Sequence, residues 1–386
     1  MKKLFLSVLL ILLLAACGGG PGGGPAADTE ESSGTDANGE VQLAEQLSVY
    51  NWSDYIDEAM ITNYEETYGV DVIYDTFASN EDLLAKLQAG AEGYDVIFPS
   101  DYMVAIMIDL GLLSEIDTAD VPNFANIDPQ FVGAPFDPNN DYCVPYQWGT
   151  TGIGYRADVE FFQENPPNSW AYVFEPEMLE QYADQGINVL NDPRELPGSA
   201  LIYLGYDPNT TNPDEIGAAR DYLIDRGGNV RSIAQDDGQE KLLSGEVDMV
   251  IEYSGDIFQI IANCEANPEQ NCAGKYAYVI PAEGGVRWVD NLAIPTDAPH
   301  PEFAHAFIDY ILDAQVGADI SNYTAYATPN QAAIDQELIL PEYLESTVIY
   351  PDEATNETLF STIDLGDEVA RLYNDAWLEL RTLLGQ

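Results

Sequence analysis

Segments typical of β-strands alternate with segments of helical periodicity along the chain from residue 46 onward. Ser79 suits the N-cap of one such helix, because Asp82 follows three residues later and Gly90 ends the apolar pattern. Strands that alternate with helices favour a parallel β-sheet covered by helices on both faces. In this first series we expect strands at residues 46–50, 70–74 and 94–98, and helices at residues 56–68, 79–90 and 102–110.

A second series with the same alternation begins near Thr151. Two α/β series without a repeat of fixed period predict a two-lobed protein. Ligands of such folds bind at the carboxyl ends of the strands, so a cleft between the lobes is the expected site. The candidate strands of the second series are residues 187–190, 247–251, 276–280 and 286–289, and the candidate helices are residues 213–225, 235–243 and 256–263.

The N-terminus has the composition of an export signal. Lys2 and Lys3 precede an apolar run, residues 4–16, which is too short to span a bilayer as a helix. Small residues then lead to Cys17, an arrangement that resembles the lipobox of bacterial lipoproteins, in which the cysteine is lipidated after cleavage. An ordinary cleavable signal that contains a cysteine is the alternative. We therefore predict a signal peptide at residues 1–16 and a lipid anchor at Cys17.

The segment after Cys17 has few large apolar side chains and is rich in Gly, Pro, Ser, Ala and acidic residues up to about residue 45. Such a segment cannot bury enough apolar surface to order itself, so we predict a disordered linker over residues 17–45. A protein tethered to the outer or periplasmic face of the cell membrane suggests capture of something outside the cell.

Export also bears on the remaining cysteines. Cys264 and Cys272 bracket a short polar loop, and in an oxidising compartment we expect a disulfide between them. Cys143 is then left as a small buried thiol. The chain has two histidines, and neither lies near a cysteine in sequence, so we expect no metal site and no catalytic cysteine.

The charge of the chain is strongly one-sided. Thirteen Lys and Arg residues face 67 Asp and Glu residues, a formal net charge of −54. Such a field repels phosphate backbones and acidic lipids, which argues against nucleic-acid binding and against any membrane contact other than a lipid anchor. It suits either a cationic ligand or a salty habitat, and the charge by itself does not separate the two.

Known nucleotide and hydrolase motifs are missing or poorly placed. The sequence has no glycine loop ending in Gly-Lys-Ser/Thr and no Gly-x-Ser-x-Gly turn. Gly152 and Gly154 fit part of a dinucleotide fingerprint, but the chain continues to Pro166 and Pro167 and not into a helical pattern. A strand that crosses between the lobes, with glycines at points of bending, is the preferred interpretation.

Aromatic residues next to carboxylates recur at the ends of the candidate strands. Trp288 and Asp290, for example, alternate on one strand and therefore point to the same side. A cation with a hydrocarbon chain needs both carboxylates and aromatic rings as partners. Carboxylates accept hydrogen bonds from its ammonium groups, and ring faces attract its charge. Carboxylates with stacking aromatics would also suit a sugar site or a glycosidase. The residues alone thus indicate an exported two-lobed protein that binds something small.

At these residues the sequence resembles the spermidine/putrescine-binding proteins of bacterial ABC importers, over roughly residues 46–386. The resemblance rests on several blocks in the same order: residues 50–55 (YNWSDY), 94–100 (YDVIFPS), 137–142 (DPNNDY), 145–149 (PYQWG), 288–295 (WVDNLAIP) and 328–330 (TPN).

This resemblance implies a type II periplasmic-binding fold with a ligand cleft between two doubly wound α/β domains. The expected lobes are residues 46–150 with 291–329, and residues 151–290 with 330–386. It further implies a monomer without cofactor or enzymatic activity, which delivers a polyamine to the permease subunits of an ABC transporter.

The ligand contacts that the resemblance implies fall into three groups. Rings would line the methylene chain, carboxylates would accept from amines, and further polar groups would add hydrogen bonds. The rings are Trp52, Tyr55, Tyr253 and Trp288; the carboxylates are Asp54, Asp192, Glu195, Asp256 and Asp290; the polar groups are Ser53, Ser100, Tyr102, Tyr326 and, at a position where spermidine binders carry Gln, Thr362.

The sequence combines features of two ligand types. Asp54 and Asp256 resemble the putrescine type, whereas Tyr102, Asp192 and Trp288 resemble the spermidine type. Either ligand could be accepted, with a slight preference for spermidine, because five carboxylates exceed what a diamine needs. A protein of the same fold that binds a sugar or a cationic amino-acid derivative is the alternative, and a secreted glycosidase is a third.

Overall fold

The structure is a computed structural model, which describes residues 33–35, 41–43, 45–90, 93–182, 186–227, 230–234 and 237–383. The chain divides into two compact units, Met1–Ala44 and Glu45–Gln386. In the first unit, β1 (Ser33–Thr35) pairs antiparallel with β2 (Val41–Leu43). The predicted signal peptide, Cys17 and most of the predicted linker lie outside the described residues. No helix in the described part of the chain is long and apolar enough to cross a membrane.

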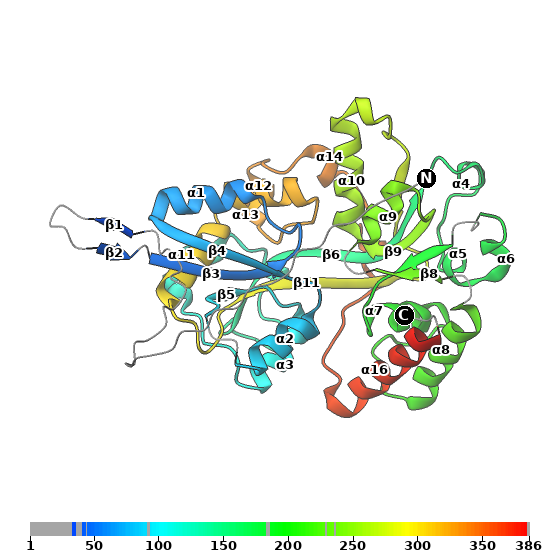
Figure 1. Cartoon of the computed structure of the whole chain (residues 1–386), viewed down its shortest axis with the longest axis horizontal. Helices are drawn as coiled ribbons and strands as arrows, with labels where there is room; N and C mark the ends of the chain where they lie inside the picture. The colour runs from blue at the N-terminus through cyan, green and yellow to red at the C-terminus, as the bar shows by residue number, and fades with distance from the viewer. Residues whose placement is uncertain are drawn as a thin grey trace, which may run out of the picture. The chain divides into compact units, whose positions relative to one another are not determined.

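The second unit is built on one ten-stranded sheet in the order β4-β3-β5-β11-β6-β9-β7-β8, with β10 beside β6 and β12 beside β11 (Figure 1). Each strand expected from the sequence is present, with its ends shifted by a few residues. The strands are β3 (Glu45–Trp52), β4 (Val70–Phe77), β5 (Val96–Ile97), β6 (Cys143–Arg156), β7 (Ile187–Val189), β8 (Val230–Ile233), β9 (Met249–Tyr253), β10 (Tyr276–Val279), β11 (Gly285–Ala293) and β12 (Leu359–Phe360).

The sheet is mixed, which corrects the expectation of a parallel sheet. Strand β3 pairs in parallel with β4 and β5, and β7 pairs in parallel with β8 and β9. Between these two groups, β6 and β11 are antiparallel to each other and to their neighbours β9 and β5. The two long strands therefore connect the groups, as yellow and green-cyan ribbons through the middle of Figure 1.

Helices cover both faces of the first strand group (β3, β4 and β5). Leu47 and Val49 of β3 pack with α1, α11 and α12 on one face, and Tyr50 packs with α2 and α3 on the other. Ser79 accepts a hydrogen bond from the N–H of Asp82, so its predicted capping role is confirmed. The helices here are α1 (Glu58–Tyr68), α2 (Asn80–Gln88), α3 (Asp101–Asp109), α11 (Pro301–Ile311), α12 (Ala314–Thr324) and α13 (Gln331–Asp335), with 3₁₀ turns at Thr118–Asp120, Pro122–Asn126 and Pro129–Phe131.

The second strand group (β7, β8 and β9) is covered in the same way. Met249 and Ile251 of β9 pack with α7, α8 and α16, whereas Val250 packs with α9 and α10 on the opposite face. This alternation along β9 is the period of two that a sheet buried on both faces produces. The remaining helices are α4 (Glu160–Glu164), α5 (Ala171–Phe174), α6 (Pro176–Leu179), α7 (Glu195–Tyr203), α8 (Pro213–Arg226), α9 (Gly238–Ser244), α10 (Ser254–Ala266), α14 (Pro341–Leu344), α15 (Glu353–Asn356) and α16 (Gly366–Leu383), with a 3₁₀ turn at Pro268–Gln270.

The two glycines of the dinucleotide-like pattern lie inside β6, and the next helix is the short α4, which begins only at Glu160, although the sequence indicated no helix before Pro166. A Cβ atom on Gly152 would lie 2.5 Å from the carbonyl oxygen of Val279, and one on Gly154 would lie 2.5 Å from the side chain of Ile257. These positions carry glycine because neighbouring atoms approach the strand closely. The interpretation as a strand between the lobes fits this packing.

The cysteines pair as expected. Cys264, near the end of α10, forms a disulfide with Cys272. Cys143, at the start of β6, is a free, buried thiol with 1% of its surface exposed.

Candidate functional site

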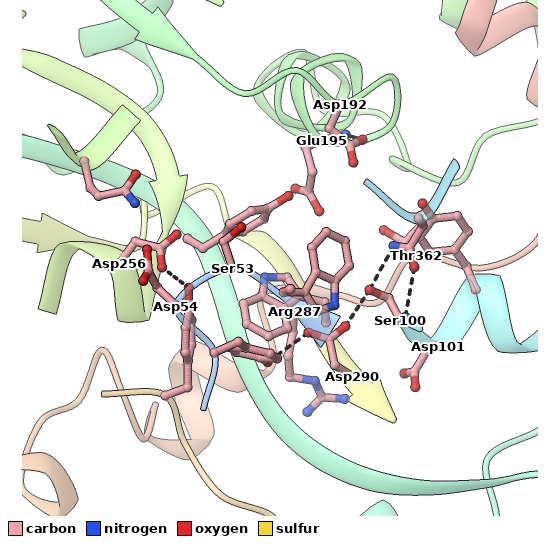
Figure 2. Close-up of a pocket in the computed structure, with 18 residues that line it drawn as sticks. Ser53, Asp54, Ser100, Asp101, Asp192, Glu195, Asp256, Arg287, Asp290 and Thr362 are labelled. Carbon is pink, nitrogen blue, oxygen red and sulfur yellow. Dashed lines mark hydrogen bonds between the residues drawn. The ribbon is translucent and has the colours of Figure 1, made fainter. Parts of the chain in front are cut away.

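One cavity, with about 780 Å³ of empty space that includes its opening to solvent, is lined by residues from both strand groups (Figure 2). All fourteen residues expected at a ligand site line this cavity: Trp52, Ser53, Asp54, Tyr55, Ser100, Tyr102, Asp192, Glu195, Tyr253, Asp256, Trp288, Asp290, Tyr326 and Thr362.

Most of these residues reach the cavity because parallel strands end there. Trp52 is the last residue of β3, Ser100 follows β5, and Tyr253 is the last residue of β9. Asp192 lies between β7 and α7. The cavity thus lies at the carboxyl ends of both strand groups, where α/β folds generally bind their ligands.

Strand β11 supplies the centre of the cavity. Trp288 and Asp290 are two residues apart on β11, and both residues line the cavity. A Cβ atom on Gly149 of the paired strand β6 would lie 2.7 Å from the indole ring of Trp288. The absence of a side chain at Gly149 therefore lets the indole lie against β6.

Two hydroxyl groups hold the carboxylate of Asp290. Ser100 donates to Oδ1 at 2.5 Å, and Tyr55 donates to Oδ2 at 2.8 Å. Asn80 in turn donates to the Ser100 hydroxyl and accepts from its backbone N–H. The carboxylate is thus fixed in the cavity by neutral donors.

Burial raises the pKa of Asp290 from 3.8 to about 7, although the hydrogen bonds from Ser100 and Tyr55 act in the opposite direction. The side chain is only 5% exposed, and it forms no ion pair with a basic residue of the described chain. A buried carboxylate without an ion-pair partner is unfavourable as a charge. A cationic ligand would supply such a partner.

A second pair of carboxyl groups lies on the α7 side of the cavity. Asp192 Oδ1 accepts from the backbone N–H groups of Arg194 and Glu195 at 2.6 and 2.9 Å, and these hydrogen bonds hold it against the start of α7. Burial raises the pKa of Asp192, and burial together with the charge of Asp192 raises the pKa of Glu195. In Figure 2 the Glu195 carboxylate points into the cavity.

Aromatic rings form the walls between the carboxylates. The Trp288 ring lies edge-on to Tyr253, with centroids 5.6 Å apart, and 5.3 Å from the ring of Tyr326. Tyr55 lies 5.1 Å from Tyr326. A Cβ atom on Gly255 would lie 2.5 Å from the Tyr326 ring, so this ring also lies over a glycine. Such rings present apolar surface to a ligand without large conformational freedom.

Asp54 and Asp256 lie on the side of the cavity opposite Thr362 in the view of Figure 2. Tyr326 donates its hydroxyl to Asp256 Oδ1 at 2.7 Å. Asp54 is exposed and adopts a left-handed backbone conformation with φ of 49°, two residues after the end of β3. The cavity therefore has carboxylates at three places: Asp54 and Asp256 on one side, Asp290 at the centre, and a further pair on the side of α7.

The cavity also has four lining residues that the sequence did not predict: Asn80, Asp101, Gln239 and Arg287. Asp101 and Arg287 are direct neighbours of the expected residues Ser100 and Trp288, so adjacency could have drawn attention to them. Asn80 follows the N-cap Ser79, and nothing in the sequence marked it as a residue of the site. Burial raises the pKa of Asp101 to about 6, with a hydrogen bond from Asn291 and the charge of Arg287 acting in the opposite direction.

Comparison with known proteins agrees with this geometry. The family of bacterial extracellular solute-binding proteins matches residues 59–343. The chain belongs to this family. The solute-binding protein is 35% identical to the putrescine-binding periplasmic protein PotF of Escherichia coli, over 87% of this chain and 91% of PotF. It is 36% identical to the spermidine/putrescine-binding periplasmic protein of E. coli, over 80% of this chain and 84% of that relative.

The solved structure of a Listeria monocytogenes protein assigned to a spermidine/putrescine ABC transporter superposes on this solute-binding protein with a TM-score of 0.78. The two are 34% identical, and the match covers 87% of this chain and 99% of the Listeria chain. The predicted two-lobed type II periplasmic-binding fold is thereby confirmed. Its relatives are extracytoplasmic proteins that bind solutes for transport.

Proposed function

We propose that this solute-binding protein captures a polyamine, putrescine or spermidine, in the cavity at the carboxyl ends of its strands. Asp290 carries the proposal, because it is a buried carboxylate fixed by Ser100 and Tyr55 with no basic partner in the described chain. A ligand ammonium group would replace the missing counter-charge and donate hydrogen bonds to Asp290. The similarity to putrescine- and spermidine-binding relatives supports the same ligand class.

The arrangement of the other side chains suits a flexible cation of this kind. Trp52, Tyr55, Tyr253 and Trp288 would cover the methylene groups, with cation–π contributions of about 0.5–2 kcal/mol each. Asp54 and Asp256 would receive one end of the ligand, and Asp192 and Glu195 would receive a further amine. A diamine needs only two of these positions, so we propose that the longer triamine also binds.

Capture would use the two-lobed construction. We propose that residues 46–150 with 291–329 form the first lobe and residues 151–290 with 330–386 form the second. Ser100 and Tyr55 would then belong to the first lobe, and Asp192, Glu195 and Asp256 to the second. A ligand that bridges these groups stabilises the closed arrangement, because only that arrangement offers all of its partners at once.

A role in transport requires an attachment site and a partner. We propose that the protein is anchored through lipidated Cys17 on the extracytoplasmic face of the membrane, acts as a monomer, and passes its ligand to the permease of an ABC importer. Binding without chemical conversion is sufficient for this role.

The decisive experiment is calorimetric titration of the folded protein with putrescine, spermidine and a neutral oligosaccharide. The buffer should contain high salt, because loose ion exchange on a surface of this charge is then screened. We expect saturable one-to-one binding of a polyamine and no heat from the oligosaccharide. Absence of polyamine binding by a folded protein would refute the proposal.

Two variants locate the binding site. Asp290→Asn should abolish or strongly weaken polyamine binding, because it removes the central charge while keeping the side-chain shape. Asp214→Asn, which removes an exposed carboxylate in the first turn of α8, should leave binding unchanged. Equal affinities for the two variants would point to a different solute or a different site.

A further inference from the structure

Thr362 lies on a short connecting segment, here called the strap (Ser361, Thr362 and Ile363). On one side of the strap, β12 pairs with the start of β11, and on the other side the chain continues into α16. Thr362 lines the ligand cavity. It also lines a second cavity, with about 1500 Å³ of empty space that includes its opening to solvent, and this second cavity shares Asp101, Tyr102 and Arg287 with the first. The strap therefore forms part of the partition between the two cavities.

The second cavity could accommodate an extension of a polyamine. Its walls include the apolar side chains of Phe131, Pro135 and Phe136, which suit methylene groups. Two carboxylates, Asp101 and Asp364, also line it. A cation longer than spermidine would therefore find suitable partners beyond the strap if the partition opened.

Two side chains that do not line either cavity hold the strap in place. Asn209 donates to the carbonyl oxygen of Ser361 at 2.9 Å, and its amide oxygen accepts from the backbone N–H of Ile363 at 3.2 Å. Arg194 donates to the carbonyl oxygen of Ile363 at 3.1 Å and to the amide oxygen of Asn209 at 3.0 Å. Backbone groups on both sides of Thr362 are thus bound, and Thr362 itself is left facing the ligand cavity.

The hydrogen bonds from Asn209 and Arg194 to the strap are here called the clamp. The loop that carries Asn209 is itself held in place by further contacts. Tyr373 is fully buried and donates to the carbonyl oxygens of Pro208 and Thr210, the two neighbours of Asn209. The guanidinium of Arg194 lies 4.9 Å from the centre of the Tyr373 ring. The side chain of Asp207 accepts from the N–H of Asn209. Asn209 therefore presents its amide from a fixed loop.

We propose that Asn209, together with Arg194, fixes the strap as an end wall of the polyamine cavity and so sets the length of polyamine that the cavity admits. This inference rests on the proposed function. Asn209 is a positioning residue, because it acts on the ligand through the backbone that carries Thr362. Loss of the clamp would free the strap, join the two cavities and favour tetraamines over diamines.

The test compares Asn209→Ala with the unaltered protein by titration with putrescine, spermidine and spermine. We expect the ratio of spermine affinity to putrescine affinity to rise about tenfold in the variant, because several hydrogen bonds that hold the wall are lost. Asn209→Asp keeps the acceptor for Ile363 and Arg194 but loses the donor to Ser361, so we expect it to raise the ratio less than Asn209→Ala does. Asn165→Ala, an exposed asparagine at the end of α4, is the matched control and should change nothing.

A second measurement does not need a ligand. Hydrogen exchange of the Ile363 amide should be faster in Asn209→Ala than in the unaltered protein, because this N–H donates to Asn209. An unchanged exchange rate of the Ile363 amide would overturn the inference that Asn209 holds the strap. Faster exchange with an unchanged affinity ratio would overturn the length-setting role, as would an equal loss of affinity for all three amines. If the unaltered protein binds no polyamine, the proposed function fails and the length-setting role fails with it, while amide exchange still tests the clamp.

Discussion

Ser100 donates its hydroxyl to Oδ1 of Asp290 at 2.5 Å, although 190 residues separate the two in sequence. Ser100 follows β5, a parallel strand of the first group, and Asp290 lies on β11, one of the two long strands that connect the groups. This hydrogen bond favours the charged form of Asp290 against the effect of burial. It therefore bears directly on how readily the cavity accepts a cation.

Substitution Ser100→Ala should make polyamine binding more sensitive to acid. Removal of the hydroxyl raises the pKa of Asp290 further above about 7, so at neutral pH less of the carboxylate is charged. We expect affinity for putrescine at pH 7 to fall about tenfold, the equivalent of about 1.4 kcal/mol. Titration over a pH series should show the midpoint of binding displaced to higher pH. Ser244 is an exposed serine at the end of α9, and Ser244→Ala should not shift the pH dependence of polyamine binding.

The unaltered protein should bind a polyamine more weakly as the pH falls. Asp290 has a pKa of about 7 in the ligand-free state, and the pKa values of Asp192 and Glu195 are also raised. Ammonium ligands bind the deprotonated carboxylates, so binding releases protons and loses affinity as the pH falls through about 7. Calorimetry in buffers of different ionisation enthalpy would measure this release near pH 6.5. Affinity that is constant from pH 8 to pH 5.5 would contradict the prediction.

The ligand-free protein should be less stable at pH 8 than at pH 5. Between about pH 4 and pH 7 the folded protein keeps a proton on Asp290 that the unfolded chain has released, so the free energy of unfolding falls as the pH rises. A shift from 3.8 to about 7 corresponds to up to about 4 kcal/mol.

Thermal unfolding at the two pH values would measure this effect. Saturating putrescine should narrow the difference, because the ligand compensates the buried charge at high pH. Asp290→Asn removes the contribution of this residue to the pH dependence of the free energy of unfolding and leaves the acidic surface unchanged. An identical pH dependence in Asp290→Asn would mean that Asp290 does not cause the effect, which would then come from the acidic surface or from the other buried carboxyl groups, such as Asp192 and Glu195.

Removal of the disulfide should affect stability and not binding. Cys264 and Cys272 close a short loop after α10, and neither residue lines the ligand cavity. We expect Cys264→Ala with Cys272→Ala to lower the free energy of unfolding by about 2–3 kcal/mol, as the entropy of such a loop suggests. Denaturant unfolding would measure the loss, and titration with putrescine should give the original affinity. A large loss of affinity in the folded variant would show that the end of α10 contributes to the site.

Much of the strand and helix pattern could be predicted, because local sequence determines it. Ser79 caps α2 through its own side chain, and the apolar segments 46–50 and 70–74 become β3 and β4. The long strand β6 was harder to define, since all but the last of its residues are buried and burial on both faces removes the alternation that marks a strand. Its antiparallel direction, like that of β11, depends on pairing with distant strands.

The sequence by itself indicated part of the site, because strand ends are local features and the carboxyl ends of parallel strands meet at one edge, whereas Tyr326 and Thr362 followed only from the resemblance to a known family. Trp52, Ser100, Asp192 and Tyr253 could be placed there for that reason. Only the tertiary structure decided how they act together. The raised pKa of Asp290 results from burial between segments far apart in the chain, and the hold of Asn209 on the strap joins residues more than 150 positions apart. Burial and distant hydrogen bonds are properties of the folded chain, so no local pattern could reveal them.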